Sequence, residues 1–320
     1  MPLPRASMAL MRSAGSSKYQ PQSEWAAHLR DRALETFVAH DLGACLEAFR
    51  RHNAFYAERL VGVSAWVDAQ PLAKSDVQAL AAGGDEPIYE SRTSGTSGFQ
   101  VTVRNSISER HFRQALAYRP FLFYPLNDKV IRQVIFVDGI DVDVVDKQQW
   151  PFDFGGRQYL TWRVGIAAPP EQILALLLSV RPQVLRGMTS GIVRFASAVN
   201  TQLDDLGVEV VSPSGEHLLP EWRQLLTDSF AAPVLDRYGS TETGSLAWQC
   251  PYCDDYHANS DEIIIEATAT GLLATPLFIE SQPLLRYSLG DQVALHADGH
   301  DCRIRLPRLE VLEARRRLDY

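Results

Sequence analysis

Residues 170–211 read PEQILALLLSVRPQVLRGMTSGIVRFASAVNTQLDDLGVEVV, a stretch in which helical and extended patterns alternate. Apolar residues recur at helical spacing in its longer segments, and its short segments are rich in Val and Leu. The alternation continues to residue 235, and it predicts helix 171–180, strand 183–185, helix 190–203, strand 208–211, helix 221–230 and strand 233–235. Strands joined by crossover helices are typical of a parallel α/β sheet, which is the fold class that we predict.

The sequence on either side of this stretch extends the prediction. Residues 130–137 are rich in β-branched side chains and predict a further buried strand. Beyond residue 260 the apolar spacing changes to two, which predicts a small, barrel-like β-rich unit with strands over 262–267, 276–280, 284–287, 292–296 and 302–306. We therefore expect four parts: a flexible start over 1–22, α/β subdomains with mixed or parallel sheets over 23–240, a β-rich subdomain over 241–313 and a hinge-like end over 314–320.

The composition of the 320 residues narrows the class of protein. Hydrophobic residues make up 46% and charged residues 22%, which is typical of soluble globular chains of roughly two domains. A net charge of -8 repels phosphate backbones and anionic lipid, so we expect neither nucleic acid nor membrane as a partner. The longest apolar run, over 173–180, is far shorter than the ~20 residues of a membrane helix. The first residues lack a signal-peptide pattern, and we expect a cytoplasmic protein.

A loop rich in glycine and hydroxyl groups follows an extended segment that ends at Tyr89. Glycines let backbone N–H groups converge on an anion, and Ser or Thr hydroxyls add further donors. The loop lacks the Gly-Lys-Ser/Thr ending of the common P-loop and the Gly-x-Gly-x-x-Gly dinucleotide fingerprint. It is either a polyphosphate-binding loop or a flexible turn, and its residues are Thr93, Ser94, Gly95, Thr96, Ser97 and Gly98.

A second segment, VLDRYGSTETG over 234–244, follows the last strand of the alternating region. Ligands of open α/β sheets bind outside such carboxyl ends. Tyr238 offers a flat ring for a base, Ser240 and Thr241 offer hydroxyls, and Glu242 offers a hard oxygen ligand for magnesium on phosphates. The alternative is a glycine-punctuated surface loop with an exposed glutamate.

A third segment, PLLRYSLGD over 283–291, reads as a strand that runs into a glycine turn and presents the carboxylate of Asp291. Such a carboxylate could accept both hydroxyls of a ribose. In isolation, Gly290-Asp291 is also an ordinary turn. Three consecutive arginines over 315–317 could contact a phosphate or be solvated.

Taken in this order, the segments resemble the adenylate-forming superfamily of acyl-coenzyme A synthetases, and they are most similar to phenylacetate-coenzyme A ligase and its relatives. The resemblance covers about residues 50 to 320. It implies that the loop over 93–98 binds pyrophosphate, that Tyr238 and Gly239 lie at the adenine, and that Thr241 contacts phosphate. It also implies that Glu242 binds Mg²⁺ and that Asp291 holds the ribose. A weaker match, Ser214-Gly215-Glu216, lies beside the adenine in relatives.

The sequence departs from this family in three places. The family loop continues with Lys-Pro, whereas Phe99-Gln100 follows here, so a cation over the phosphates is missing from that place. The family's later Gly-Arg element is approximated by Ala314-Arg315, which makes Arg315 a candidate nucleotide contact. The family carries a further domain with a catalytic lysine, and we expect this chain to end at the hinge before it.

Three cysteines and one histidine form a complete tetrahedral zinc set: Cys250, Cys253, His257 and Cys302. Because all four positions would be filled by protein, we expect the zinc to be structural. Some phenylacetate-ligase relatives resemble this chain in having a Cys and a His at the spacing of the first and third of these residues. A redox pair and unrelated cysteines beside a loop histidine are the alternatives.

These features together predict ATP-dependent activation of a small organic acid, such as an aromatic acid, to its acyl-AMP with release of pyrophosphate. Thr241 and Glu242 are the expected catalytic residues, and Phe136, Val137 and Gly244 are expected to line the acid pocket. The expected acyl acceptor is coenzyme A. An amine, a hydroxyl or a carrier-protein thiol is the alternative acceptor, and a non-catalytic nucleotide-binding protein is a third hypothesis. Candidate protein partners are a carrier protein, a separate C-terminal domain and a second copy of the chain.

Overall fold

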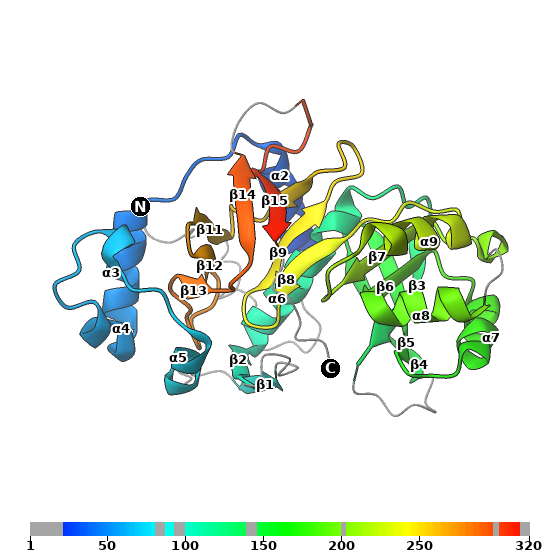
Figure 1. The fold of residues 1–320 in the computed structure, drawn as a ribbon, viewed down its shortest axis with the longest axis horizontal. Coiled ribbons are helices and arrows are strands. Elements are labelled where there is room, and N and C mark those ends of the chain that lie inside the picture. The colour runs from blue at the N-terminus through cyan, green and yellow to red at the C-terminus, as the bar shows by residue number, and fades with distance from the viewer. Residues whose placement is uncertain are drawn as a thin grey trace. The chain divides into compact units, whose positions relative to one another are not determined.

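The computed structural model describes residues 22–80, 87–92, 100–138, 146–199, 203–296 and 301–313 (Figure 1). The chain divides into two compact units. The first contains residues 1–117, 240–247 and 255–320, and the second contains residues 118–239 and 248–254. In the described residues no helix is both long enough and apolar enough to cross a membrane.

The second unit contains the predicted α/β sheet. Its strands are β3 (Val130–Val137), β4 (Asp146–Phe154), β5 (Arg157–Gly165), β6 (Val184–Met188), β7 (Val210–Ser214) and the start of β8 (Arg237–Ser240). Strands β5, β3, β6, β7 and β8 pair in parallel in that order, and β4 pairs antiparallel with β5. The mixed sheet that the sequence predicts is therefore confirmed.

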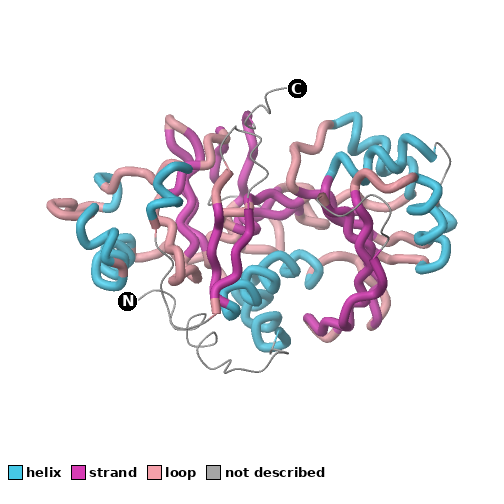
Figure 2. Tube along the Cα trace, turned by 90° about the horizontal axis from the view of Figure 1, so that it is seen from below, coloured by secondary structure: helices cyan, strands magenta, loops and turns pink. Residues whose placement is uncertain are grey.

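Three helices connect the parallel strands: α7 (Pro170–Val180), α8 (Thr189–Val199) and α9 (Pro220–Phe230). Each connection moves across the sheet in the same direction, and parallel crossovers are almost always right-handed. Right-handed crossovers in one direction place their helices on one side of the sheet, and Figure 2 shows this arrangement. Two short 3-10 helices complete this unit, over Arg119–Leu122 and Asp204–Leu206.

The core of this unit lies between the helices and one face of the sheet. Phe136 of β3 packs against Phe195 of α8, whose ring stacks on Phe230 of α9 at 6.5 Å between centroids. Strands β3 and β6 approach closely, because Gly187 has a φ of 116° and a Cβ there would lie 2.1 Å from the backbone oxygen of Phe136. A larger residue at Gly187 would push the two strands apart.

One predicted strand of this region is wrong. Residues 233–235 form an isolated bridge between Val211 and Val234, and the strand begins at Arg237 instead. The helices over 171–180, 190–203 and 221–230 are confirmed as α7, α8 and α9, with ends that differ by a few residues.

The first unit begins with helices: α2 (Gln22–Leu34), α3 (Leu42–His52), α4 (Ala54–Arg59), a 3-10 helix (Trp66–Asp68), α5 (Lys74–Ala79) and α6 (Ile107–Tyr118). Strands β1 (Ile88–Arg92) and β2 (Thr102–Ser106) form an antiparallel hairpin just before α6. The start of α6 is set by a capping box, since Ser106 Oγ accepts from the Glu109 N–H at 3.3 Å and Glu109 Oε2 accepts from the Ser106 N–H at 2.7 Å.

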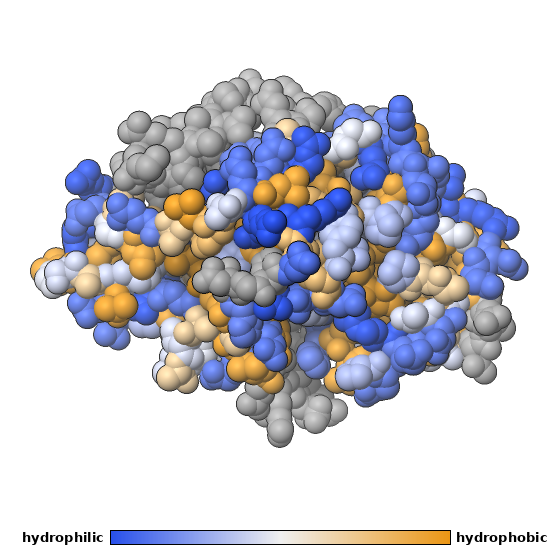
Figure 3. Space-filling model, turned by 90° about the horizontal axis from the view of Figure 1, so that it is seen from above, coloured by the Kyte–Doolittle hydropathy of each residue, from blue (hydrophilic) through white to orange (hydrophobic). Residues whose placement is uncertain are grey.

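The β-rich part of this unit begins before residue 260. Its strands are β9 (Gly244–Gln249), β10 (Tyr256–Ala258), β11 (Ile263–Thr268), β12 (Gly271–Pro276), β13 (Tyr287–Ser288), β14 (Gln292–His296) and β15 (Arg308–Glu313). The strands predicted over 262–267 and 292–296 are confirmed as β11 and β14. Strands β11, β12 and β13 form one antiparallel sheet, and β15 pairs antiparallel with both β14 and β10. Figure 3 shows hydrophilic and hydrophobic side chains interspersed on the surface that it presents.

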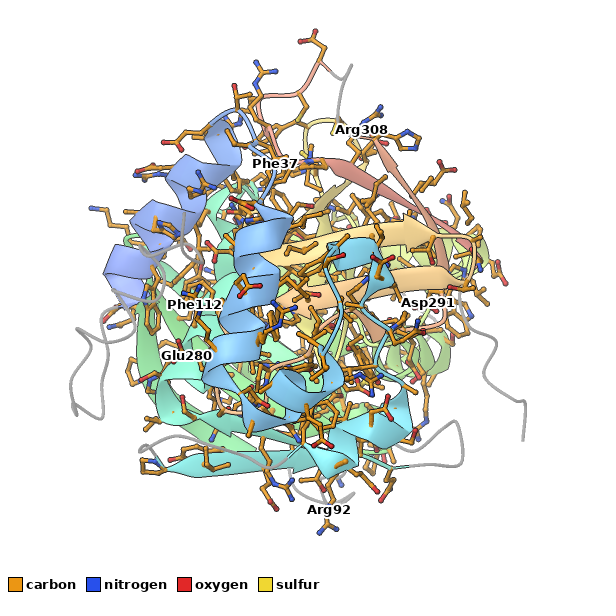
Figure 4. The ribbon with its side chains drawn as sticks, turned by 90° about the vertical axis from the view of Figure 1, so that its left-hand side faces the viewer. Phe37, Arg92, Phe112, Glu280, Asp291 and Arg308 are labelled. Carbon is orange, nitrogen blue, oxygen red and sulfur yellow. The ribbon has the colours of Figure 1, made fainter. Side chains whose placement is uncertain are left out.

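Two strands predicted in this part, over 276–280 and 302–306, are wrong because other groups hold their backbone N–H groups, and of the strand predicted over 284–287 only Tyr287 lies in a strand, β13. In the segment over 276–280 and the residue after it, the N–H groups of Glu280 and Ser281 donate to Glu109 Oε1 at 2.6 and 2.8 Å. In the segment over 302–306, the Ile304 N–H donates to Cys302 Sγ and the Arg305 N–H donates to the carbonyl of Ala33. Figure 4 labels Glu280 and, on α6, Phe112.

Candidate active site

A cavity of about 240 Å³ lies in the first unit, lined by Tyr89, Glu90, Ser91, Asn105, Arg110, Arg113 and Thr241. This volume is below the roughly 300 Å³ at which pockets for whole drug-sized ligands begin, so it suits a small polar group. Four of its residues come from the β1–β2 hairpin, two from α6 and one from the segment over 234–244. The cavity therefore joins one segment that the sequence predicts to bind nucleotide, over 234–244, to the strand that precedes the predicted phosphate loop.

The predicted phosphate loop itself, Thr93 to Gly98, lies outside the described residues, as does Arg315. The ends of the hairpin that carries the loop are described, and Arg92 pairs with Thr102. Figure 4 labels Arg92, the last residue of β1. Ser91, which lines the cavity, is therefore two residues from the start of the loop.

Two arginines bring positive charge to this cavity. Arg110 and Arg113 are three residues apart on α6, a spacing that places them on one face of the helix. The guanidinium of Arg110 lies 4.7 Å from the centre of the Tyr89 ring. Burial lowers the pKa of Arg113 to about 10, although the carboxylates of Glu109 and Glu242 act in the opposite direction. Arg113 therefore stays cationic at neutral pH, and the two guanidinium groups suit an anionic ligand.

Arg113 also fixes the backbone at Thr241 and Glu242. Its Nη2 donates to the carbonyl of Thr241 at 2.5 Å, and its Nη1 donates to the carbonyl of Glu242 at 2.9 Å. Gly244 has a φ of 84°, and a Cβ there would lie 3.6 Å from the guanidinium carbon. The turn is closed by Ser240, whose hydroxyl accepts from the Thr243 N–H at 3.1 Å.

Glu242 is 7% exposed, and its Oε1 accepts a hydrogen bond of 2.9 Å from the hydroxyl of Tyr287. Tyr287 belongs to the Arg-Tyr element that the sequence predicts to lead to the ribose ligand. In the described residues no hydrogen bond involves Oε2 of Glu242. In proteins, Mg²⁺ typically binds through one or two carboxylates and the phosphates of a nucleotide, and Oε2 of Glu242 is an oxygen of this kind.

Arg286, the first residue of that element, has a structural role. Its Nε and Nη2 donate to the two carboxylate oxygens of Glu266 at 3.1 and 3.0 Å, and its Nη1 donates to the carbonyls of Val67 and Ala69. Its backbone φ is 49°, which is uncommon for a residue with a side chain. These four hydrogen bonds fix the backbone just before Tyr287.

Asp291, the predicted ribose ligand, follows Gly290, whose φ is 82°. The carbonyl of Asp291 accepts from the Leu272 N–H at 2.7 Å, which ties the turn to β12. Its side chain is half-buried, and Figure 4 labels it.

The remaining predicted nucleotide residues lie at the carboxyl edge of the sheet in the second unit. Ser214 ends β7 and pairs with Arg237, the residue before Tyr238. Glu216 uses its Oε2 to accept from the Ser190 N–H at 2.6 Å, so it caps the start of α8. Gly215 has a φ of 83° and lies against Met188. Ser214, Tyr238 and Gly239 are half-buried.

Two of the three predicted acid-pocket residues belong to β3. Phe136 is 1% exposed and is part of the core between the sheet and the helices. Val137 ends the strand and is half-buried. The third, Gly244, lies beside Arg113 as described above.

The four predicted zinc ligands are divided between the two units: Cys250 and Cys253 follow β9 in the second unit, and His257 of β10 and Cys302 belong to the first. His257 is fully buried, and its Nδ1 is 2.9 Å from the carbonyl of Leu306, which leaves Nε2 as the ligand nitrogen. Three thiols and one imidazole are a donor set that zinc prefers.

Sequence reasoning missed Arg110, Arg113 and Tyr287 as site residues. The signal for the arginines was the missing loop lysine, since a phosphate site without it needs positive charge from another segment. No pattern in the local sequence shows that the helix after the loop supplies this positive charge.

No known protein-family model matches this chain. A segment of 127 residues is 33% identical to the indoleacetate–lysine synthetase of Pseudomonas savastanoi and covers 38% of this chain and 32% of that protein. The chain thus matches about a third of the length of this relative.

Solved structures are similar over most of the chain. An open conformation of 2-hydroxyisobutyryl-CoA ligase, in complex with 2-HIB-AMP and CoA, has a TM-score of 0.67 at 15% identity, covering 92% of this chain and 72% of that one. The same ligase in its thioesterification state has a TM-score of 0.66 at 16% identity, covering 92% and 70%. The fold of this chain is therefore that of the adenylate-forming ligases.

Proposed function

We propose that this chain binds ATP and activates a carboxylic acid as its acyl-AMP, with release of pyrophosphate. The observation that carries the proposal is the cavity in the first unit. There the strand before the Ser/Thr-Gly loop, two arginines of α6 and the Thr241–Glu242 turn converge. A loop rich in N–H donors, two cations and a carboxylate for Mg²⁺ are the groups that a polyphosphate requires.

In the proposed reaction a carboxylate oxygen of the acid forms a bond to the α-phosphorus of ATP. The bond from that phosphorus to the oxygen that bridges to the β-phosphate breaks, and the electron pair leaves with pyrophosphate. Little covalent chemistry is required of the protein, so positioning and charge neutralisation supply the catalysis. Arg110 and Arg113 bind the phosphates, and Thr241 offers its hydroxyl. Glu242 would hold Mg²⁺, which would supply positive charge opposite the phosphate oxygens.

The proposed acyl acceptor is coenzyme A, because the ligase whose fold this chain shares is a CoA ligase by name. An amine is the second candidate, and a different observation favours it. The relative found by sequence is named as a synthetase that joins indoleacetate to lysine. Both names fit a small organic acid as substrate, and an aromatic acid is the form that we propose. Likeness to phenylacetate-coenzyme A ligases, a cytoplasmic location, a carrier protein and a homodimer stay predictions.

A structural zinc ion at Cys250, Cys253, His257 and Cys302 is part of the proposal. Metal analysis of purified protein should give about one zinc per chain. Cys302→Ser should lower that content, whereas Cys45→Ser should leave it unchanged because Cys45 lies in α3. Clearly less than one zinc in the unmodified protein would contradict the zinc site.

The test of the activity is carboxylate-dependent exchange of labelled pyrophosphate into ATP, measured with a panel of aromatic, fatty and amino acids. We expect at least one acid to support exchange, and Glu242→Gln should reduce its rate at least a hundredfold. Glu58→Gln, at an exposed position on α4, is the matched control and should keep the rate. Bound ATP without exchange for any acid would favour the non-catalytic alternative. Product masses with coenzyme A or with amines then identify the acceptor.

A further inference from the structure

Two arginines lie on the face of the second unit's sheet that points away from α7, α8 and α9. Arg186 of β6 pairs in register with Ser212 of β7, and Ser214 of β7 pairs with Arg237 of β8. Because paired residues share a face, and residues two apart on a strand do so as well, all four side chains point the same way. The core residues Leu185 and Val211 alternate with them and point toward the helices.

Within the part of the chain that the structure describes neither arginine forms an ion pair, although the nearby carboxylate of Asp236 raises the pKa of Arg237. Arg186 Nη2 donates to the hydroxyl of Tyr118 at 3.0 Å. Arg237 Nη2 donates to Ser214 Oγ at 3.1 Å and to the carbonyl of Ser212 at 3.4 Å. Asp236 uses its carboxylate to accept from the backbone N–H of Arg237 at 2.8 Å, and it forms no ion pair with the guanidinium. The Nε atoms of both arginines are buried without a hydrogen-bond partner.

The surroundings make this pair of charges costly. Desolvation lowers the pKa of Arg237 to about 10, and the nearby positive charge of Arg186 lowers it further. Arg186 lies 4.5 Å from the ring centre of Tyr118 and 5.9 Å from that of Phe121, and these cation–π contacts stabilise its charge but leave its repulsion from Arg237 in place. Like charges in a poorly solvated place repel each other strongly, and removing one from water without a partner is unfavourable. A bound anion would reduce both the repulsion between the two arginines and the cost of removing their charges from water.

We propose that Arg186 and Arg237 form a binding site for a carboxylate group of a small-molecule substrate, distinct from the carboxylate that is adenylated. In the described residues neither Nη1 donates a hydrogen bond, so each guanidinium keeps one terminal nitrogen for a ligand. Two donors match the two oxygens of one carboxylate, and the rings of Tyr118 and Phe121 suit a flat or apolar body attached to it. Both arginines are half-buried, so a ligand can reach them.

Two sources could supply this carboxylate. One is a second carboxylate on the acid substrate, and the other is the carboxylate of an amino acid that serves as acceptor. The inference that the ligand is a substrate rests on the proposed function, whereas the inference that the two arginines bind a carboxylate does not. Binding measured without ATP therefore tests the site independently of adenylation.

The experiment uses two matched ligand pairs, each with and without the proposed group. Terephthalate is compared with terephthalamide, in which neutral amides replace both carboxylates, and L-lysine is compared with cadaverine, its analogue without the carboxylate. Affinities are measured by calorimetry, and the Nε–H signals of arginine are followed by nitrogen-15 NMR. The variants are Arg186→Gln and Arg237→Gln, and Arg194→Gln is the control because Arg194 is exposed on α8 and bonds carbonyls of its own unit.

We expect one ligand of the two pairs to bind at least tenfold tighter than its analogue and to shift the Nε–H signals of both arginines. Arg186→Gln and Arg237→Gln should each remove that advantage, and Arg194→Gln should keep it. The pair that shows the advantage identifies the source. Because each substitution removes one of two repelling charges, the unliganded variants should melt at the same temperature as the unmodified protein or higher. Equal affinity within both pairs, or an advantage that survives both substitutions, would overturn the site.

Discussion

The ion pair between Arg286 and Glu266 should be among the contacts that stabilise the first unit most. The side chains are 8% and 19% exposed, so solvent screens the pair little. Arg286 makes four side-chain hydrogen bonds, two to Glu266 and one each to the carbonyls of Val67 and Ala69. Arg286→Met keeps most of the apolar stem but leaves the Glu266 carboxylate and both carbonyls without their cation.

The expected loss of stability can be bounded in two ways. Each hydrogen bond to a charged group contributes roughly 1.5–3 kcal/mol, so the sum over four bonds is an upper limit on the loss of stability. The loss stays below this limit because contributions of neighbouring hydrogen bonds are not additive. Breaking a buried ion pair from one side costs about 3–5 kcal/mol. Glu266 keeps the hydrogen bond from Trp66 Nε1 at 3.0 Å, which favours the lower end. We expect Arg286→Met to lower the free energy of unfolding by about 3 kcal/mol.

Equilibrium unfolding in urea measures this loss, with tryptophan fluorescence as the probe because Trp66 contacts the ion pair. The shift in midpoint multiplied by the slope gives the change in free energy. The control is Arg32→Met, which breaks an exposed pair with Glu35 at 3.5 Å and should cost at most ~1 kcal/mol. In the double variant with Glu266→Met, part of the stability should return. A loss below about 1 kcal/mol for Arg286→Met would refute the reasoning.

Three other predictions concern single side chains. Tyr287→Phe removes the hydroxyl that donates to Glu242, so it should cost about 1–2 kcal/mol of stability in urea unfolding and slow pyrophosphate exchange; unchanged values would contradict that contact. Gly187→Ala forces a Cβ to 2.1 Å from the oxygen of Phe136 at a φ of 116°, and it should destabilise the protein by at least about 3 kcal/mol, seen as a lower melting temperature. Burial raises the pKa of the Cys45 thiol from 9.0 to about 11, so the unfolded chain loses this proton first and stability should fall as pH rises between these values. Cys45→Ser should remove that part of the pH dependence, and an identical pH profile for the variant would count against it.

The sequence predicts those parts of the fold whose patterns are local. Strand β3 matches its predicted limits of 130–137 and β14 matches 292–296, because each is a run of apolar or alternating residues without competing partners. The segments over 276–280 and 302–306 show the same alternation but form no strand. Their N–H groups are held by Glu109, by the sulfur of the neighbouring Cys302 and by the end of α2, and the contacts with Glu109 and α2 join residues far apart in the chain.

The same distinction between local patterns and contacts of distant residues applies to the candidate site. The sequence predicts Thr241 and Glu242 because their motif is contiguous, and the structure places Thr241 at a cavity. It cannot predict that Arg113 holds the carbonyls of both residues, since Arg113 and Glu242 are 129 positions apart. It also cannot distinguish a nucleotide-binding role for Glu216 from its observed role as a helix cap, because both roles use a carboxylate after a strand.

The hydrogen bond from Tyr287 to Glu242 has a thermodynamic consequence. A cation at Glu242 withdraws electron density from the oxygen that accepts this hydrogen bond, and Tyr287 lies only four residues before Asp291. If the metal and the ribose bind at these two carboxylates, each should alter the affinity of the other by the same factor, because linkage is reciprocal. The aromatic ring of Tyr287 would then act as the coupling element, and nucleotide affinity in its Phe variant should respond less to the concentration of Mg²⁺.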